Sequence, residues 1–582
     1  MRRSAGCLLA AAAVAVILLI PLAGIPYATN LAFTLLVLFI IAQSWDWMGG
    51  LTGYFNLGHY AFYGIGAYAF AIILVGGSST PIAFLAALFA GAVAAATLAY
   101  PLFRLQGDYF AFATLALLPL FELLAFNLSP ITKGADGIML PPKYVLVPAF
   151  YAAAALAITA FLTTIVITRS RFGYALKSIK NDEQAAEVVG VHTFPTKVGI
   201  LAISAAFASL AGGIHAWQMS FIDPPTVFGL QVAFVPIAMA LLGGSGLLWG
   251  PLVGALVLFV IQHWLLTNVT ILHATIYGAI ILLIGRYMPG GLLRSGAVQS
   301  VPFLRGLAKA YHHPEIQASR SDHQMSLPLA TGHGPNGRVL LECNDVTMRF
   351  GGLVALNNVS FDVKQGEIVG LVGANGSGKT TLFNCLSMMY RPSGSISFAG
   401  HELTTLRRDQ VARLGIGRTF QIPRPFGDLT VAENIAIAGE FRAGATTLTD
   451  AFAQVDIFAR FVGLEDRLAS RADALTLQEK KSLELARALA SRPSLLLVDE
   501  VASGLTLAEV RRFIRHIREI RDRYGVTVIW VEHIFSALSQ VVDRLIVLEY
   551  GNIIADKPLA EAVVDERVLK SYLGVAGASV RR

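Results

Sequence analysis

Long apolar runs fill the first half of the chain and restrict the folds that it can adopt. Of the 582 residues, 55% are hydrophobic and only 14% are charged, whereas soluble domains carry about 25% charged residues. The excess lies before about Arg286, and from about Val339 the composition is that of an ordinary globular domain. A bilayer offers no water to hydrogen-bond a backbone, so we expect these runs to cross it as helices.

We expect about ten membrane spans, because about 20 apolar residues in a helix cross the bilayer core. The runs lie near residues 7–24, 29–48, 58–76, 81–101, 108–127, 146–168, 197–219, 230–243, 247–266 and 269–286. The run at 230–243 is short and is open to interpretation as a broken or re-entrant helix. The first run resembles a signal peptide, but more runs follow and no small-residue cleavage site is evident, so we interpret it as a retained span.

Positive charges near the ends of the runs predict the orientation of the chain. The net charge is +7, and Lys and Arg are expected on the cytoplasmic side. Placing Arg2 and Arg3 inside also places Arg104 inside. The turn Arg169–Arg171 then lies inside and the Pro-rich loop Phe221–Pro225 outside. The topology explains the positive charge, so we expect no nucleic-acid partner.

Few ionisable residues lie within the runs, and each of them needs an explanation. They are Asp46, Glu122, His215, His263 and His273. An ionisable side chain is costly inside a bilayer, so such residues are candidates for lining a solute pathway. An interhelical hydrogen bond, or a position near the end of a span, is the alternative explanation for each of them.

A glycine-rich sequence in the second half has the features of a phosphate-binding loop. Residues 373–381, Gly-Ala-Asn-Gly-Ser-Gly-Lys-Thr-Thr, fit the pattern G-x-x-x-x-G-K-[ST]. The backbone N–H groups of such a loop wrap phosphates, its lysine adds a positive charge, and its hydroxyl holds Mg²⁺. A buried strand at 367–372 and a helix from Thr381 are predicted on either side, which favours a nucleotide site over a simple turn. The predicted binding residues are Gly373, Asn375, Gly376, Ser377, Gly378, Lys379, Thr380 and Thr381.

Two carboxylates follow a second predicted strand. The apolar residues 494–498 end at Asp499 and Glu500. Two acids after a buried run are costly without a function. We therefore expect Asp499 to hold the Mg²⁺ shell and Glu500 to polarise the attacking water as a general base.

The longest internal loop on the predicted cytoplasmic side runs from Arg169 to about Thr196. Apolar residues between Gly173 and Gly190 have helical spacing, which predicts one amphipathic helix. Its apolar face would hold Tyr174, Leu176, Ile179, Ala186 and Val189. The helix either lies on the membrane surface or docks on an ATPase, and the nucleotide site in the same chain favours docking.

The order of these motifs resembles that of an ATP-binding cassette. Phe350 lies where this family stacks an aromatic ring on adenine, and Gln421, within Gly417–Pro423, matches its Q-loop. His533, after the predicted strand 528–531, matches the switch histidine that contacts the γ-phosphate. The resemblance implies ATP and Mg²⁺ as cofactors and catalytic roles for Glu500, His533 and Gln421. The implied metal ligands are Thr380, Gln421 and Asp499.

One element of this sequence differs from the family pattern. The signature LSGGQ corresponds here to Leu475, Thr476, Leu477, Gln478 and Glu479. Two side chains replace glycines whose bare backbone would approach the γ-phosphate of an opposite subunit, and Glu479 adds a negative charge there. Thr506 stands where the family has an aspartate, and Val501 where it has a proline. Cassettes of this family work as head-to-tail pairs, so we expect a heterodimer with a separate cassette subunit.

Both halves resemble components of branched-chain amino acid importers. Residues 107–116, 174–190 and 240–251 resemble the permease subunits, whereas residues 418–421 and the tail 566–574 resemble the ATP-binding subunit. The resemblance implies a second permease, a second cassette and a solute-binding protein on the outer face. It places the chain, surrounded by lipid, in the bacterial inner membrane with the cassette in the cytoplasm.

The predicted fold is a polytopic α-helical membrane domain of about ten spans followed by an α/β P-loop cassette. The predicted boundaries are 1–290 for the permease, 291–338 for a linker and 339–582 for the cassette. The implied function is ATP-driven import of branched-chain amino acids or related small polar solutes. Urea, amides and aromatic acids stay open as substrates. An exporter half-transporter and a membrane-anchored regulatory ATPase are the alternatives, although both usually have fewer spans.

Overall fold

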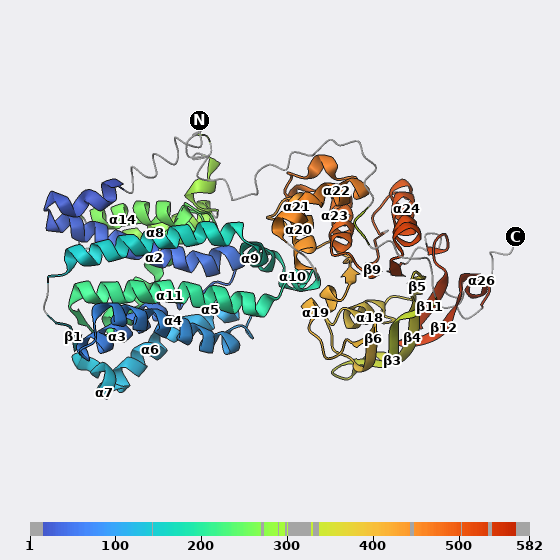
Figure 1. Ribbon diagram of the computed structural model, residues 1–582, viewed down its shortest axis with the longest axis horizontal. Coiled ribbons are helices and arrows are strands. Elements are labelled where there is room, and N and C mark those ends of the chain that lie inside the picture. Colours follow the sequence, from blue (N-terminus) through green and yellow to red (C-terminus); the bar gives the residue numbers. More distant parts are fainter. Residues whose placement is uncertain are drawn as a thin grey trace. The chain divides into compact units, whose positions relative to one another are not determined.

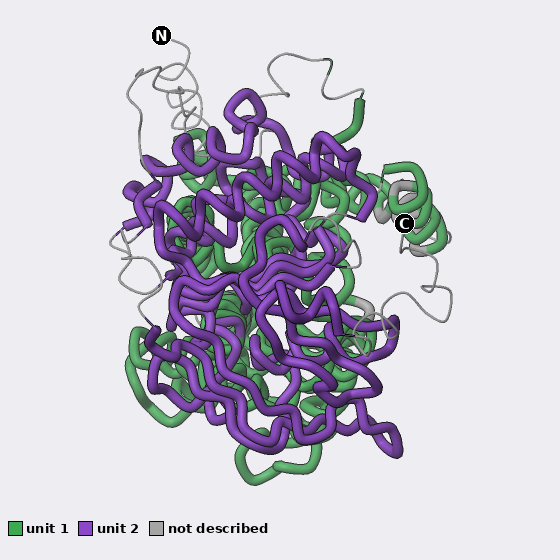
Figure 2. The backbone as a smooth tube through the Cα atoms, turned by 90° about the vertical axis from the view of Figure 1, so that its right-hand side faces the viewer, with its two compact units in different colours: residues 1–180, 194–313 green, residues 181–193, 314–582 purple. Residues whose placement is uncertain are grey.

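The chain divides into two compact units. The computed structural model describes residues 15–141, 144–268, 273–288, 290–296, 300, 327–329, 337–442, 447–501, 503–532 and 538–565. One unit, the permease unit, comprises residues 1–180 and 194–313, and the other, the cassette unit, comprises residues 181–193 and 314–582 (Figure 2). Most of the predicted linker 291–338, the beginning of the first apolar run and the tail 566–574 lie outside the described residues.

The permease unit consists almost entirely of helices (Figure 1). Its long helices are α2 (Pro26–Thr52), α3 (His59–Val75), α4 (Thr80–Leu102), α8 (Leu146–Arg169), α11 (Thr193–Met219), α13 (Leu230–Gly243), α14 (Gly250–Asn268) and α15 (His273–Tyr287). Shorter elements are α5 (Asp108–Leu115), α6 (Leu117–Asn127), α7 (Ser129–Thr132), α9 (Arg171–Asn181), α12 (Pro224–Phe228), β1 (Ile138–Met139) and β2 (Phe221–Ile222).

Six helical segments among the described residues are long and apolar enough to cross a membrane. They span residues 26–52, 80–102, 108–127, 146–169, 193–219 and 224–243. The helices at 59–75 and 250–265 are apolar but shorter, and α15 coincides with the last predicted run. The polytopic helical class is therefore confirmed, although fewer helices reach spanning length than the sequence predicts.

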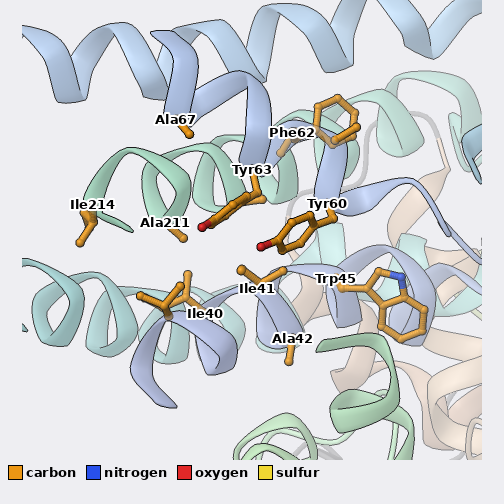
Figure 3. Close-up of a cluster of buried hydrophobic side chains, with 14 of the residues drawn as sticks. Ile40, Ile41, Ala42, Trp45, Tyr60, Phe62, Tyr63, Ala67, Ala211 and Ile214 are labelled. Carbon is orange, nitrogen blue, oxygen red and sulfur yellow. The ribbon is translucent and has the colours of Figure 1, made fainter. Parts of the chain in front are cut away.

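Small residues let α3 and α11 pack with their backbones in contact. A Cβ atom on Gly66 would lie 2.1 Å from the carbonyl oxygen of Ser209, and one on Gly212 would lie 2.0 Å from that of Tyr63. The rings of Tyr60 and Tyr63 stack with centroids 4.3 Å apart and lie near Ile41 of α2 (Figure 3). Backbone contact of this kind is typical of helix packing inside membranes.

Three of the ionisable residues in the apolar runs hydrogen-bond to another helix or to a loop between helices. Asp46 of α2 accepts the backbone N–H of Gly246 at 2.9 Å. His215 of α11 pairs with the Tyr63 hydroxyl, and His263 of α14 lies 3.0 Å from the Tyr27 hydroxyl. These contacts favour the structural explanation of the three residues over pathway lining. The side chain of His273 lies outside the described residues.

The single amphipathic helix predicted across residues 173–190 is wrong, because the chain forms two helices there. Helix α9 ends at Asn181, and α10 (Glu183–Val188) begins after Asp182. Asp182 has an extended backbone, and its Oδ1 accepts the N–H of Ala185 at 2.9 Å. Such a cap starts a new helix. Helix α10 belongs to the cassette unit, whereas the chain up to Lys180 belongs to the permease unit.

The cassette unit contains two sheets, which confirms the predicted α/β class. A four-stranded sheet has the order β4-β3-β6-β7 and a six-stranded sheet the order β12-β11-β5-β10-β9-β8. The strands are β3 (Val339–Phe350), β4 (Leu353–Lys364), β5 (Ile368–Val372), β6 (Ser393–Phe398), β7 (His401–Glu402), β8 (Ile416–Arg418), β9 (Leu495–Asp499), β10 (Thr527–Val531), β11 (Arg544–Glu549) and β12 (Asn552–Pro558). The helices are α18 (Lys379–Leu386), α19 (Arg408–Arg413), α20 (Val431–Phe441), α21 (Leu448–Ala453), α22 (Val455–Val462), α23 (Leu477–Ala490), α24 (Leu507–Tyr524) and α26 (Leu559–Ala562).

Parallel pairing brings the two predicted motifs to the same edge of the larger sheet. Strand β10 pairs in parallel with both β5 and β9. The carboxyl ends of these strands therefore meet at one edge, which is where open α/β sheets bind ligands. The glycine-rich loop follows β5, and Asp499 ends β9, so the loop and the acidic pair come together.

Candidate nucleotide site

A cleft of about 980 Å³ in the cassette unit gathers most of the predicted nucleotide-site residues. Its lining includes Phe350, Asn375, Gly376, Ser377, Gly378, Lys379, Thr380, Thr381, Gln421 and Glu500. Leu353, Val354, Ala355 and Tyr550 complete the lining. His533 lies outside the described residues, so its predicted contact with a phosphate remains a prediction.

The glycine-rich loop needs its glycines for backbone conformation. Gly376 has φ +80° and Gly378 has φ +107°, values that side-chain-bearing residues rarely adopt. Lys379 folds back over the loop and donates hydrogen bonds to the carbonyl oxygens of Gly373 at 2.8 Å and Ala374 at 3.0 Å. Burial lowers the pKa of Lys379, and the charges of Glu500 and Asp499 oppose this shift. The loop therefore fixes the Lys379 ammonium close to its own backbone N–H groups.

Asp499 is buried, and one of its carboxylate oxygens has no hydrogen-bond partner among the described residues. Burial raises the pKa of Asp499, while Arg418, whose Nη2 lies 3.6 Å from its Oδ2, acts in the opposite direction. Its Oδ1 has no hydrogen-bond partner among the described residues, and neither has the buried Oγ of Ser377. Hard cations such as Mg²⁺ prefer oxygen ligands of this type. The residues present thus fit Mg²⁺, because Asp499 and Ser377 each have an oxygen to which no described residue hydrogen-bonds, and Thr380, an exposed residue, lines the cleft beside Ser377.

Glu500 has a strained backbone next to this acid. Its φ is +42°, in the left-handed region, although it is not a glycine. Its N–H donates to the carbonyl oxygen of Val531 at 2.9 Å, and its carboxylate accepts a hydrogen bond from Nε2 of Gln421. Strained residues of this kind persist where the surrounding structure holds them, often at functional sites. The structure thus brings together Glu500 and the Q-loop glutamine, two of the three predicted catalytic residues.

Two aromatic residues, Phe350 and Tyr550, also line the cleft. Phe350, at the end of β3, is 41% exposed, and its ring contacts Tyr390 edge-on at 5.1 Å. Tyr550, which is 86% exposed, lies at the turn between β11 and β12. The next residue, Gly551, donates its N–H to the carbonyl oxygen of Ser377 at 3.0 Å and so ties this turn to the loop. Sequence reasoning missed Tyr550, whose signal was an aromatic-glycine turn between two apolar strands.

A buried carboxylate positions the Q-loop. Glu484 of α23 accepts the N–H of Phe420 at 3.1 Å and that of Arg424 at 3.0 Å. Burial raises the pKa of Glu484, and the charge of Arg487 opposes this shift. Glu484 therefore holds the backbone on both sides of Gln421. The signal in the sequence was an acid between two leucines, Leu483 and Leu485, in the helix that follows the signature segment.

The divergent signature residues form a closed helix cap. The Thr476 side chain accepts the N–H of Glu479, and Oε2 of Glu479 accepts the N–H of Thr476 at 2.8 Å. Arg467 donates to the other carboxylate oxygen at 2.9 Å. The hydrogen bond from Thr476 is the main reason that the pKa of Glu479 is lowered. The negative charge expected to oppose a phosphate is thus directed at the start of its own helix, and Leu477 beside it is 52% exposed.

Lys481, on the same helix, holds the chain that follows Glu500. Its ammonium donates hydrogen bonds to the carbonyl oxygens of Val501, at 2.7 Å, and Ser503. Burial lowers the pKa of Lys481, against the charges of Glu532 and Glu500. The segment in which Val501 replaces the family's proline is therefore fixed by a lysine.

Residues 181–193, hereafter the docking segment, are held by arginines of the cassette unit. Arg408 pairs with Glu187 at 2.8 Å, and Arg413 donates to the carbonyl oxygen of Gly190 at 2.9 Å. Arg424, which follows the Q-loop, pairs with Asp182 at 3.3 Å. The docking segment therefore contacts the part of the cassette that also carries Gln421.

Comparisons with known proteins match both halves of the chain. A family model described as the permease component of the branched-chain amino acid transport system matches residues 27–285, and one described as ABC transporter matches residues 356–503. The high-affinity branched-chain amino acid transport ATP-binding protein LivG of Salmonella typhimurium is 36% identical over 251 residues, which are 41% of this chain and 98% of LivG. LivG of Escherichia coli is 35% identical over the same length, with the same shares covered. BraF of Pseudomonas aeruginosa is 34% identical over 254 residues, 41% of this chain and 99% of BraF.

A polytopic helical unit and a P-loop cleft in one chain define a membrane transporter subunit that carries its own ATPase. The chain belongs to the ATP-binding cassette transporters of the branched-chain amino acid type, as a permease domain fused to an ATPase domain. It is thus a multi-pass membrane protein and a component of a multi-subunit transporter.

Proposed function

We propose that this chain couples ATP hydrolysis to the import of branched-chain amino acids across the bacterial inner membrane. The observation that carries the proposal is the docking segment. It leaves and re-enters the permease unit, yet its ion pairs are with two arginines of the cassette, Arg408 at the start of α19 and Arg424 after the Q-loop. The names of the LivG and BraF relatives supply the substrate class.

The cleft divides the work on the nucleotide among its residues. The loop N–H groups and Lys379 bind the phosphates, and Phe350 and Tyr550 flank the base. Asp499, Thr380 and Gln421 would hold Mg²⁺, which when bound neutralises charge on the phosphates.

Glu500 acts as the general base in this proposal. Gln421 orients the Glu500 carboxylate through the hydrogen bond described above. Because Glu484 fixes the Q-loop backbone, movement of the docking segment at Arg424 reaches the same glutamine. His533 is proposed to contact the γ-phosphate.

Contacts within the permease unit support the proposed orientation, with the cassette in the cytoplasm. The positive-inside pattern places the loops at residues 128–145 and 220–229 outside, and β1 and β2 of these loops pair with each other. It places residues 49–57 and 243–250 inside, and these two loops approach each other at Gly50 and Gly246. Loops assigned to the same side are therefore neighbours.

The proposed partners are a second permease, a second cassette and an external solute-binding protein. The closed cap at Thr476–Glu479 supports a separate cassette, because its polar groups already bond to one another. The cleft of this chain would then work against the signature of the partner cassette.

Uptake into vesicles tests the proposed function. The chain is reconstituted with the permease, cassette and binding protein encoded beside it, and labelled leucine, isoleucine and valine are offered with internal or external ATP. ATP-dependent uptake of these amino acids, absent in a Glu500→Gln variant, is the expected result. Uptake of urea, an amide or an aromatic acid instead would overturn the substrate class, and ATP-driven efflux would overturn import.

A further inference from the structure

Two lysines flank the docking segment, and both reach the same short stretch of the permease unit. Lys180, directly before the segment, donates from Nζ to the carbonyl oxygen of Gly50 at 2.9 Å. Lys197, near the start of α11, donates to the hydroxyl of Tyr54 at 3.0 Å. Both acceptors lie at the end of α2 or in the loop that follows it. The two ends of the docking segment are therefore attached to one place, residues 50–54.

Both attachments are well packed. Lys197 is 3% exposed, and its ammonium lies 4.7 Å from the centre of the Tyr54 ring and 5.1 Å from that of Phe103. A Cβ atom on Gly53 would lie 3.3 Å from Cγ of Lys180, so α9 packs directly on the end of α2. A displacement of either lysine would thus be passed to α2 rather than absorbed by loose side chains.

The same end of α2 is joined to the break between α13 and α14. Asp46, one turn before Gly50, is 2% exposed and accepts the N–H of Gly246 with Oδ1 at 2.9 Å and Oδ2 at 3.0 Å. Ser245 also hydrogen-bonds to this carboxylate, and Lys180 and Arg294 are the cations that act on it. Turn hydrogen bonds from Leu247 to Gly244 and from Gly250 to Leu247 hold the break locally, and the contact of Asp46 with Gly246 attaches it to α2.

Glycines allow α2 and the α13–α14 break to pack in direct contact. A Cβ atom on Gly50 would lie 2.2 Å from Oδ1 of Asp46 and 2.6 Å from the nitrogen of Gly246. A Cβ atom on Gly246 would lie 3.0 Å from the Gly50 carbonyl oxygen and 3.7 Å from Nζ of Lys180. The hydrogen bond from Lys180 to the Gly50 carbonyl and the Asp46–Gly246 pair therefore lie directly against each other.

We infer that Lys180 and Lys197 are positioning residues that pass movement of the docking segment to the α13–α14 break through residues 50–54 and Asp46. The inference rests on the proposed coupling role of the docking segment. Two attachments at one place transmit both translation and rotation, whereas one attachment would act as a hinge. Neither lysine is among the residues that line the nucleotide cleft, so their loss should separate hydrolysis from transport.

The first test compares uptake and hydrolysis in the same vesicles. The variants are Lys180→Met, Lys197→Met and both together in the complete transporter, with Lys180→Arg and Lys197→Arg as conservative replacements. Lys177→Met is the matched control, because Lys177 lies on the same helix and its ammonium stacks on the Tyr174 ring.

We expect the double variant to lose about tenfold in solute moved per ATP hydrolysed, the factor by which a charge-assisted hydrogen bond shifts an equilibrium. The arginine variants and the Lys177→Met control keep the ratio within about twofold of the wild-type value. An unchanged ratio in the double variant, or a parallel loss of hydrolysis and uptake, overturns the inference.

A second readout does not depend on the solute. Ser245→Cys places a thiol in the break, and its rate of maleimide labelling is measured with and without ATP in the Glu500→Gln background, above the labelling of the parent chain. We expect ATP to change the rate when both lysines are present and to leave it unchanged in the double methionine variant. A response that persists without the lysines, or is absent with them, contradicts the inference even where uptake fails for another reason.

Discussion

Two segments of the cassette that precede helices, the P-loop before α18 and the signature segment before α23, have opposite chemistry. At the P-loop, Gly376 and Gly378 hold the backbone open, and the buried oxygens Ser377 Oγ and Asp499 Oδ1 have no partner among the described residues. At the signature segment, Thr476 and Glu479 satisfy each other in a capping box. The first segment is built to take a ligand and the second to complete its own helix.

The difference shows how the same element acquires different functions. A helix N-terminus attracts anions only while its N–H groups remain available. At α23 the Glu479 carboxylate is itself the anion at the helix N-terminus, and Arg467 pairs with its charge. The polar groups that could contact a phosphate are thus available at the P-loop, whereas those of the signature segment are already bonded to one another.

The largest effect should come from the carboxylate beside the P-loop. Glu500→Gln removes the proposed general base, so we expect ATP hydrolysis by the assembled transporter to fall by about 10²- to 10⁴-fold. Nucleotide binding should be retained, as measured by a fluorescent ATP analogue. Glu479→Gln, the matched change in the signature segment, should leave hydrolysis near the wild-type rate, and equal losses in both variants would contradict the contrast.

The next effect should come from the lysine in the P-loop. Lys379→Met removes the charge nearest the phosphates, and we expect nucleotide affinity to fall by about 10- to 100-fold, the range for a lost charged hydrogen bond. Lys480→Met, in α23, is the control and should bind nucleotide as the wild type does. Titration of the purified chain with the same analogue measures both, and similar affinities for the two variants would argue against the phosphate role.

Opening the signature segment should have a smaller and opposite effect. Leu477→Gly together with Gln478→Gly restores bare backbone, and we expect hydrolysis by the chain without its partner cassette to rise about tenfold, a modest share of what backbone N–H donors contribute elsewhere. The expectation depends on a low rate for the unmodified chain alone. If that chain already hydrolyses ATP at the full rate of the transporter, the heterodimer proposal fails.

The smallest effect should be on stability alone. Thr476→Ala removes the cap of α23, which costs about 1 kcal/mol. The melting temperature of the purified protein should therefore fall by a few degrees, while Thr476→Ser, which keeps the hydroxyl, should melt like the wild type. Nucleotide affinity should not change in either variant. A lower affinity in Thr476→Ala would mean that this segment supports the chain's own cleft.

Sequence reasoning succeeded where a pattern is local. The buried strands predicted at 367–372, 494–498 and 528–531 correspond to β5, β9 and β10, because continuous apolar runs of strand length allow few other structures. The P-loop was predicted from its local glycine motif, Glu500 from its place after a buried strand and Gln421 from the family resemblance, and the cleft brings them together.

Sequence reasoning failed where side-chain hydrogen bonds, rather than apolar periodicity, decide the local structure. The periodicity of residues 173–190 predicts one helix, yet the Asp182 cap divides it, and its second half belongs with the cassette unit. The direction of the Glu479 charge depends on Thr476 and Arg467, and Tyr550 reaches the cleft through the turn after β11. The spacing of apolar residues along the chain predicts none of these three features.

The sequence by itself determined the class of protein, since apolar runs of spanning length and a glycine-rich phosphate loop each have essentially one physical solution. Only the tertiary structure decided which polar groups are already paired and which are left for a ligand. Only the tertiary structure, too, attached Lys180 and Lys197 to residues 50–54. Hydrogen bonds between residues far apart in the chain depend on packing, which no single segment specifies.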